Sequence, residues 1–335
     1  MLNQKRGIWG KPPKKNERLH QLEEKLPELL AGTRAPSTML SYTQAFRRWK
    51  TWCEEVGVSH LPADHYDVCL FAIEKSETGV TMSTIENYMS AIALMHMVSG
   101  LEDPTKNVFL KQVLQSIKRG TCTNKEDKNV VSVNDLHLMV QNTDVENLKE
   151  LRICTMMLLA FFSFMRINEV IHIKLEDLKF GEENLEINIP ISKTDQFRKG
   201  QKVIVGKGND NVCPLFFLKL YLAKVGNMKN EDYIFRPLQF VKDQDVRLKP
   251  TNRPMTYSNT RDEFKNLVKK AGLTQKKLKL HGLRSGGASA AANVGVPDRI
   301  IQKQGRWKTV SVKNDYIKEN ISKFSSITSE ILSKR

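Results

Sequence analysis

Hydrophobic residues recur at helical spacing through the first third of the chain. The clearest stripe, at intervals of three and four residues, consists of Met39, Tyr42, Phe46, Trp49, Cys53 and Val56. Ser37 or Thr38 precedes this stripe and is suited to cap the start of a helix. Similar stripes predict shorter helices around residues 64–75, 82–96 and 110–117. The pattern therefore predicts a domain of four or five helices over residues 20–120.

The pattern changes at both ends of this domain. Residues 1–19 are rich in Gly, Pro and basic residues, so we expect a flexible arm there. Residues 121–129 are polar throughout and are the best linker candidate in the chain. The apolar pattern resumes at Val130, and we expect a second, larger domain over residues 130–320.

The second domain combines helices with a small amount of β-structure. Residues 151–164 are nearly all apolar and predict a buried helix that runs directly into Arg166. Apolar positions alternate with polar ones from Leu185 to Ile191, and residues 202–205 give a second β-rich run, so the two predict a hairpin. Helical character returns at residues 260–270 and 281–293. The predicted fold is mainly α, with a small β-hairpin or sheet.

The positive charge of the chain is concentrated at its two ends. The formal net charge is +16, from 53 basic and 37 acidic residues among 335. Residues 1–18 hold six basic residues and one acidic residue, and residues 269–335 hold fifteen and four, while the stretch between them is balanced. A localised basic field attracts polyanions, which favours a nucleic-acid partner. For the N-terminal arm alone, a role in solubility is the alternative.

Several classes of function are excluded by what the sequence lacks. The five cysteines are scattered, without zinc spacing, so we expect reduced thiols, an intracellular protein and no metal site. The longest apolar run, Ile153 to Met165, is too short to cross a bilayer, so no membrane insertion is expected. Phosphate-loop and dinucleotide motifs are absent, and we expect no cofactor.

Five short motifs stand in the order of the motif regions of a known enzyme family. They are Arg166-Ile-Asn-Glu169, Ser192-Lys193-Thr194, His281-Gly-Leu-Arg284, Gly305-Arg306-Trp307 and Asn314-Asp315-Tyr316. Each motif is weak alone. Taken in this order, with nine residues from Trp307 to Tyr316, they resemble the tyrosine recombinase (phage integrase) family over residues 37–325. The sequence from His281 to Val296 looks most like recombinases of eukaryotic mobile elements, such as the Crypton or DIRS types.

The resemblance implies a catalytic role for each matching residue. Displacement at a phosphodiester puts negative charge on the non-bridging oxygens, and Arg166 and Arg284 match the family's pair of guanidinium donors. His281 lies one helical turn from Arg284 and would donate to the same phosphate or handle the proton of Tyr316. Tyr316 matches the nucleophile, and a phenol, with a pKa of about 10, needs this cationic surround to attack.

Three further residues complete the implied site. Trp307 occupies a position where the family has His or Trp, and its indole N–H can donate one hydrogen bond. Lys193 matches the hairpin lysine that protonates the departing 5′ oxygen. Glu169 would orient an arginine or histidine of the site without contacting the phosphate itself.

Each assignment has an ordinary structural alternative. Arg166 could end the apolar helix with an ion pair to Glu169, His281 could be a capping or packed histidine, and Trp307 could belong to the core. For Lys193, the neighbouring lysines are alternatives, because loops tolerate shifts of register: Lys199, Lys202 and Lys207.

The resemblance implies a two-domain DNA clamp, with a helical core-binding domain and an α+β catalytic domain. It implies a site-specific DNA recombinase that forms a 3′-phosphotyrosine intermediate, integrates or excises a mobile element, and acts as a homotetramer on two DNA duplexes. The alternatives are a type IB topoisomerase and a domesticated DNA-binding protein without strand exchange.

An apolar stripe within residues 321–335 predicts a terminal helix that docks either in cis or on a neighbouring protomer. We expect a nuclear location in a eukaryote and a cytoplasmic one otherwise.

Overall fold

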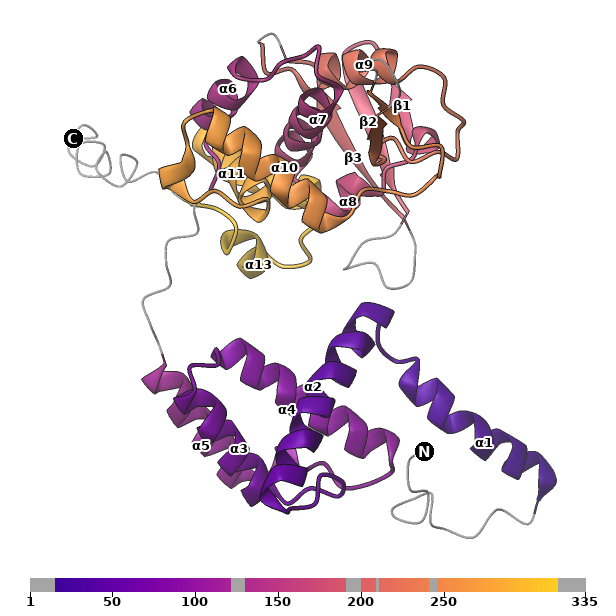
Figure 1. Ribbon diagram of the computed structural model, residues 1–335, viewed down its shortest axis with the longest axis vertical. Helices are drawn as coiled ribbons and strands as arrows, with labels where there is room; N and C mark the ends of the chain where they lie inside the picture. Colours follow the sequence, from indigo (N-terminus) through magenta and orange to yellow (C-terminus); the bar gives the residue numbers. More distant parts are fainter. Residues whose placement is uncertain (1–15, 122–129, 191–199, 209–210, 241–245, 319–335) are drawn as a thin grey trace, which may run out of the picture. The chain divides into compact units, whose positions relative to one another are not determined.

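The computed structural model describes residues 16–121, 130–190, 200–208, 211–240 and 246–318 (Figure 1). The chain divides into two compact units, residues 1–126 and 127–335, and each is described by itself. The division falls inside residues 121–129, the predicted linker, most of which lies outside the described residues. The same holds for most of the predicted arm and for the terminal segment 321–335.

The first unit is helical. Its α-helices are α1 (Glu17–Ala31), α2 (Pro36–Val56), α3 (His65–Glu77), α4 (Met82–Val98) and α5 (Val108–Gly120). The predicted stripe faces the core except at its last residue, Val56, which is exposed. In this core, Trp49 stacks on Trp52 with ring centroids 5.4 Å apart. Phe71 of α3 meets Trp49 edge-on at 5.1 Å. Both indole N–H groups are satisfied, by the His60 carbonyl and by Glu74, so the two large rings can be buried without an orphaned donor.

Two helix starts differ from the prediction. Helix α2 begins at Pro36 with Ala35 in the cap position, rather than with Ser37 or Thr38 as cap, because proline suits the first helical position. Helix α1 begins at Glu17, inside the arm predicted over residues 1–19. The Asn16 side chain accepts the Leu19 N–H and caps this helix, so residues 17–19 are helical.

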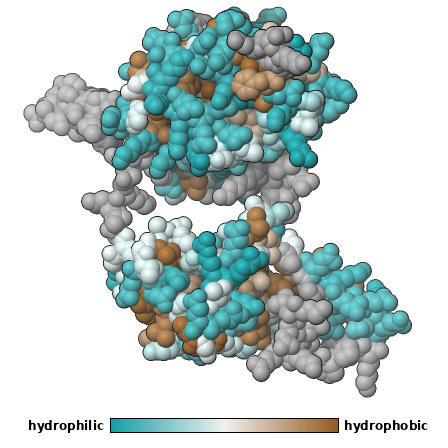
Figure 2. Space-filling view, viewed as in Figure 1, coloured by the Kyte–Doolittle hydropathy of each residue, from teal (hydrophilic) through white to brown (hydrophobic). Residues whose placement is uncertain are grey.

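The second unit combines helices with two small antiparallel sheets. Its helices are α6 (Val133–Gln141), α7 (Leu148–Phe162), α8 (Ile167–Ile171), α9 (Pro214–Val225), α10 (Tyr257–Lys270), α11 (His281–Asn293), α12 (Asp298–Gly305) and α13 (Val310–Asn314). Its strands are β1 (Leu178–Phe180), β2 (Asn184–Ile189), β3 (Gln201–Gly206), β4 (Leu238–Phe240) and β5 (Val246–Leu248). Hydrophilic residues cover most of the face of this unit shown in Figure 2.

The predicted hairpin is confirmed as strands β2 and β3. Leu185 pairs with Val205 and Ile187 with Val203, and these four side chains are buried on one face of the sheet. Strand β1 adds to the other edge of β2, an extension that the short sequence Leu-Lys-Phe does not reveal. The segment that joins β2 to β3 lies mostly outside the described residues.

Helix α7 is the centre of the second unit, as its apolar sequence predicts. It packs against α9, α10 and α11, and its residues from Leu151 to Phe161 are all buried. Within the described residues, no helix is both long and apolar enough to span a membrane.

Helix α11 approaches α7 closely because it carries two adjacent glycines. A Cβ at Gly286 would lie 2.0 Å from the Val131 carbonyl oxygen, and one at Gly287 would lie 2.0 Å from the Phe161 carbonyl oxygen. Both clashes are with backbone, which cannot move aside as a flexible side chain can. The glycines thus bring the start of α11, with His281 and Arg284, against the end of α7.

We predict that Gly287→Ala lowers the free energy of unfolding by about 1–3 kcal/mol or more, because the added methyl overlaps the Phe161 carbonyl. Urea unfolding followed by circular dichroism measures this change. Gly120→Ala, at the end of α5, is the control, since a Cβ there meets nothing within 4 Å. Equal unfolding midpoints for the two variants would contradict the packing described here.

Candidate active site

Arg166 stands at the turn between α7 and α8. After Ser163, which follows the last residue of α7, the chain reverses through Phe164 in the left-handed region, with a φ of 51°. Arg166 then takes the N-cap position of α8 in an extended conformation. Glu169 accepts the Arg166 backbone N–H at 2.8 Å and its Nη1 at 2.9 Å, so one carboxylate holds both the backbone and the side chain of this arginine.

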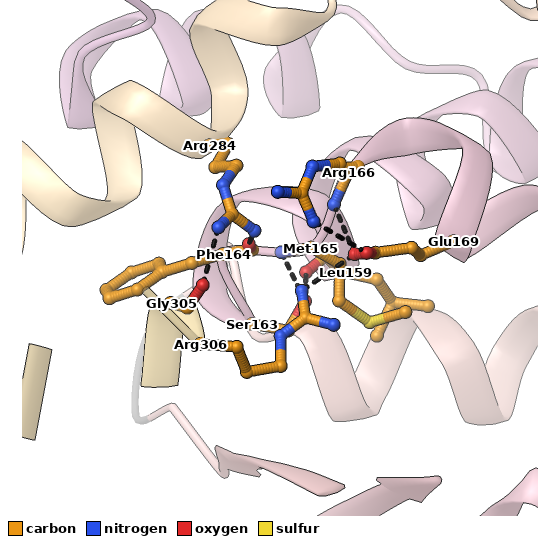
Figure 3. A network of polar contacts seen from close by, with 9 residues as sticks. All are labelled: Leu159, Ser163, Phe164, Met165, Arg166, Glu169, Arg284, Gly305 and Arg306. Atoms are coloured by element: carbon orange, nitrogen blue, oxygen red, sulfur yellow. Dashed lines mark hydrogen bonds and ion pairs between the residues drawn. The ribbon is translucent and has the colours of Figure 1, made fainter. Parts of the chain in front are cut away.

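Glu169 also pairs with Arg306, from the end of α12. Nη2 of Arg306 donates to Oε2 of Glu169 at 2.7 Å, and the two side chains are 4% and 5% exposed (Figure 3). Burial alone would raise the pKa of Glu169, but the charges and hydrogen bonds of Arg306 and Arg166 outweigh it and lower the pKa below its ordinary value. The carboxylate is therefore ionised at neutral pH.

Arg284 lies under the aromatic residues of the site. It is 1% exposed, and its two Nη atoms donate to the backbone carbonyls of Phe164 and Gly305. Burial, together with the repulsion of Arg166 and Arg306, lowers the pKa of Arg284 to about 10, so the guanidinium remains charged at pH 7. Two of its five N–H groups serve these carbonyls, which leaves others for a ligand.

Two aromatic rings lie over this guanidinium, and the His281 ring contacts one of them. The Arg284 guanidinium lies 4.7 Å from the ring centroid of Trp307 and 5.2 Å from that of Tyr316. The Tyr316 ring in turn contacts His281 at 5.3 Å and Trp307 at 5.1 Å, measured between centroids. Tyr316 is half-buried, whereas His281 is exposed.

The segment that carries Tyr316 is anchored on both sides of the ring. Before it, Lys313 is 2% exposed and pairs with Asp298 of α12 at 2.6 Å. After it, Ser289 of α11 accepts the Lys318 backbone N–H at 2.8 Å and donates to the Tyr316 carbonyl at 3.4 Å. These contacts hold the tyrosine beside the arginines.

The fold thus gathers six of the seven residues singled out from the sequence: Arg166, Glu169, His281, Arg284, Trp307 and Tyr316. The seventh, Lys193, lies outside the described residues. Among its alternatives, Lys202 pairs with Glu186 at 2.7 Å and Lys207 with Glu183 at 3.1 Å, both at exposed positions of the β2–β3 hairpin.

Two residues of the site also have the ordinary structural roles given as alternatives in the sequence analysis. Arg166 does form the ion pair with Glu169 beyond the apolar helix. Trp307 belongs to a small hydrophobic cluster with Phe164, Ala288 and Ile301. Packing and chemistry therefore coincide here, because a site that presents fixed donors needs rigid support.

Arg306 belongs to the site but is not among the residues predicted from the sequence, although it stands in the motif Gly305-Arg306-Trp307. The signal available was a basic residue between Gly305 and Trp307. A Cβ at Gly305 would lie 1.9 Å from the Trp307 ring, which explains the glycine. Nothing in the local sequence shows that Arg306 turns inward to Glu169, 137 residues away.

The arrangement can bind and polarise a phosphate diester. Three guanidinium groups surround one carboxylate, so the site retains excess positive charge. Among the described residues, several buried donors have no hydrogen-bond partner, including Nε of Arg284 and the indole N–H of Trp307. The described part of the chain holds no cluster of His, Cys, Asp and Glu that could bind a metal.

Comparison with known proteins finds recombinases that match most of this chain. A xerD homolog of the integrase/recombinase type from Selenomonas ruminantium is 26% identical over 321 residues, which cover 93% of this chain and 92% of the relative. The cre recombinase of Escherichia phage P1 is 21% identical over 285 residues, 81% of each chain.

Solved structures share the fold. The Tn1549 transposon integrase in complex with transposon right-end DNA has a TM-score of 0.63 at 15% identity, covering 92% of this chain and 98% of that one. The XerH recombinase bound to a palindromic difH substrate has a TM-score of 0.57 at 15% identity, covering 87% and 78%. The model of the phage integrase family matches residues 129–323, a stretch that contains every residue of the site. The chain therefore belongs to the phage integrase family and is a tyrosine recombinase.

Proposed function

We propose that this tyrosine recombinase breaks and rejoins duplex DNA at specific sites through a 3′-phosphotyrosine link at Tyr316. The observation that carries the proposal is the position of the Tyr316 ring. It lies 5.2 Å from the Arg284 guanidinium and against both His281 and Trp307. A phosphate held by these donors would lie beside the phenol, which is the arrangement that in-line attack requires.

The reaction exchanges one phosphodiester for another. The phenol oxygen of Tyr316 forms a bond to phosphorus and gives up its proton to solvent or to His281, while the bond to the 5′ oxygen breaks. Arg166 and Arg284 stabilise the negative charge on the non-bridging oxygens, and the indole N–H of Trp307 adds one donor. Lys193 gives a proton to the departing 5′ oxygen. In the second step, the 5′ hydroxyl of a partner strand attacks the phosphotyrosine and releases Tyr316.

The covalent link conserves the energy of the phosphodiester. Each step forms one phosphate ester and breaks another, so strand exchange needs no nucleotide hydrolysis. This matches the sequence, in which phosphate-loop motifs are absent.

The proposed substrate is double-stranded DNA. The excess of basic residues at the two ends of the chain supports it, and two similar structures are complexes with DNA. Exchange between two duplexes uses four strands, so we propose a homotetramer on DNA. The apolar stripe within residues 321–335 is the candidate contact between protomers.

The proposed biological role is the integration or excision of a mobile element. The likeness of residues 281–296 to eukaryotic mobile elements supports this role, and the similarity to a transposon integrase is consistent with it. The protein would act in the nucleus of a eukaryotic host and in the cytoplasm otherwise.

We predict that the wild-type protein forms a covalent adduct with a nicked duplex that contains its site, and that Tyr316→Phe forms none. A pool of nicked duplexes that includes DNA flanking the gene serves as substrate, and a denaturing gel detects the adduct. Tyr316→Phe should keep salt-sensitive DNA binding, because the phenyl ring retains its packing on Trp307 and Arg284.

Two outcomes of this experiment would contradict the proposal. DNA binding without any adduct would indicate a binding protein that no longer exchanges strands. Relaxation of plasmids irrespective of their sequence, lost in Tyr316→Phe, would indicate a topoisomerase.

We predict that Lys193→Ala slows adduct formation by about 10²–10⁴-fold, because a general acid is lost. A substrate with sulfur in place of the bridging 5′ oxygen should restore most of the rate, since a thiolate leaves without protonation. Lys202→Ala is the matched control, as Lys202 is exposed and paired with Glu186. The same sulfur rescue for Lys202→Ala, and none for Lys193→Ala, would move the role to Lys202.

A further inference from the structure

Arg306 lies between two residues of the site, yet the proposed reaction assigns it no role. Its backbone adopts the left-handed region, with a φ of 56°, at the end of α12, a position that glycine or asparagine usually takes. Its side chain is 4% exposed. An arginine that is both buried and in an unfavourable backbone conformation must be held there by its contacts.

The contact that holds Arg306 reaches the residues around Arg166. Its Nη2 donates to Oε2 of Glu169 at 2.7 Å, and the same oxygen accepts the Arg166 backbone N–H at 2.8 Å. Oε1 of Glu169 accepts Nη1 of Arg166 at 2.9 Å. Glu169 is thus shared between two arginines from distant parts of the sequence.

The Arg306–Glu169 pair joins two segments of the chain, the turn after α7 and the end of α12, and Arg284 joins the same two segments. Arg284 bridges them through the backbone carbonyls of Phe164 and Gly305, and Arg306 bridges them through the Glu169 carboxylate (Figure 3). One segment carries Arg166, and the other carries Trp307 and leads to Tyr316. The position of the Arg166 guanidinium relative to Tyr316 therefore depends on both bridges.

We propose that Arg306 is a positioning residue for the DNA cleavage step, which rests on the function proposed above. By occupying one side of Glu169, it leaves the Arg166 guanidinium only partly engaged and free to bind the phosphate. Without Arg306, the acceptor position that it occupies on Oε2 of Glu169 is open to the Arg166 side chain, which already donates to Oε1. The Arg166 guanidinium then turns toward Glu169 in a two-point pair and away from the phosphate.

Exposure separates the roles of the two arginines. The Arg166 side chain is 22% exposed and can meet a phosphate from solution, whereas that of Arg306 is 4% exposed. Arg306 therefore acts through Glu169 and Arg166, and its loss should change the rate of cleavage more than the affinity for DNA.

Single-turnover adduct formation on a nicked duplex tests this assignment in the full-length protein. Arg306→Gln should lower the rate at saturating DNA by about 100-fold, the order expected for a misplaced catalytic group. The DNA concentration that gives half of the maximal rate should change by less than about 3-fold. Arg306→Lys keeps a charged donor for Glu169 and should recover to within about 10-fold of wild type. Arg261→Gln, at an exposed ion pair on α10, is the control.

If Arg306→Gln is unstable, Arg306→Lys, which keeps the charge pair, carries the test. A double variant of Arg306→Gln and Glu169→Gln removes both buried charges together and shows whether the two side chains act as one unit. Glu169→Gln should slow the wild type but should not slow Arg306→Gln further, since the two side chains act as one unit. A wild-type rate in Arg306→Gln, a loss confined to DNA affinity, or additive losses in the double variant would each overturn the assignment. If the wild-type protein itself forms no adduct, the proposed function fails instead.

Discussion

The arrangement of the site in the second unit depends on one set of interactions, the ion pairs that the buried Glu169 carboxylate forms with Arg166 and Arg306. A charge removed from water must be paired, and breaking such a pair from one side typically costs about 3–5 kcal/mol. Here the pair also fixes geometry, because Glu169 holds the backbone N–H of Arg166 and its side chain at once. The pair between Glu169 and Arg306 thereby joins the turn after α7 to the end of α12. The turn carries Arg166, and the end of α12 leads to the segment that carries Tyr316.

Close backbone approach is the second requirement of the site. Gly286 and Gly287 let α11 lie against the Val131 and Phe161 carbonyls, and Gly305 lets the Trp307 ring fold back over the chain. The carbonyls of Phe164 and Gly305 are then within reach of Arg284. The Arg284 guanidinium is in this way held by backbone oxygens, which are less easily displaced than side chains, and the Tyr316 and Trp307 rings pack on it.

Sequence reasoning predicted the parts of this structure that have a local pattern. The stripe from Met39 to Val56, the apolar run of α7 and the alternation in β2 each follow from hydrophobic periodicity. The ordered motifs named the residues that the fold gathers around Tyr316. Arg306 was missed, because its partner Glu169 is 137 residues away and no local spacing encodes that contact. Strand β1 and the start of α2 were missed because a three-residue strand and a proline-initiated helix leave little signal. The role of Lys193 remains a prediction.

The most direct test of this account is to locate the DNA on the protein. The trapped adduct, digested with nuclease and trypsin, can be analysed by mass spectrometry, since cleavage after Lys313 and Lys318 isolates residues 314–318, which contain one tyrosine. The account predicts a 3′-phosphonucleotide on Tyr316, in the segment anchored by Lys313 and Ser289. A nucleotide on any other of the seven tyrosines would contradict it.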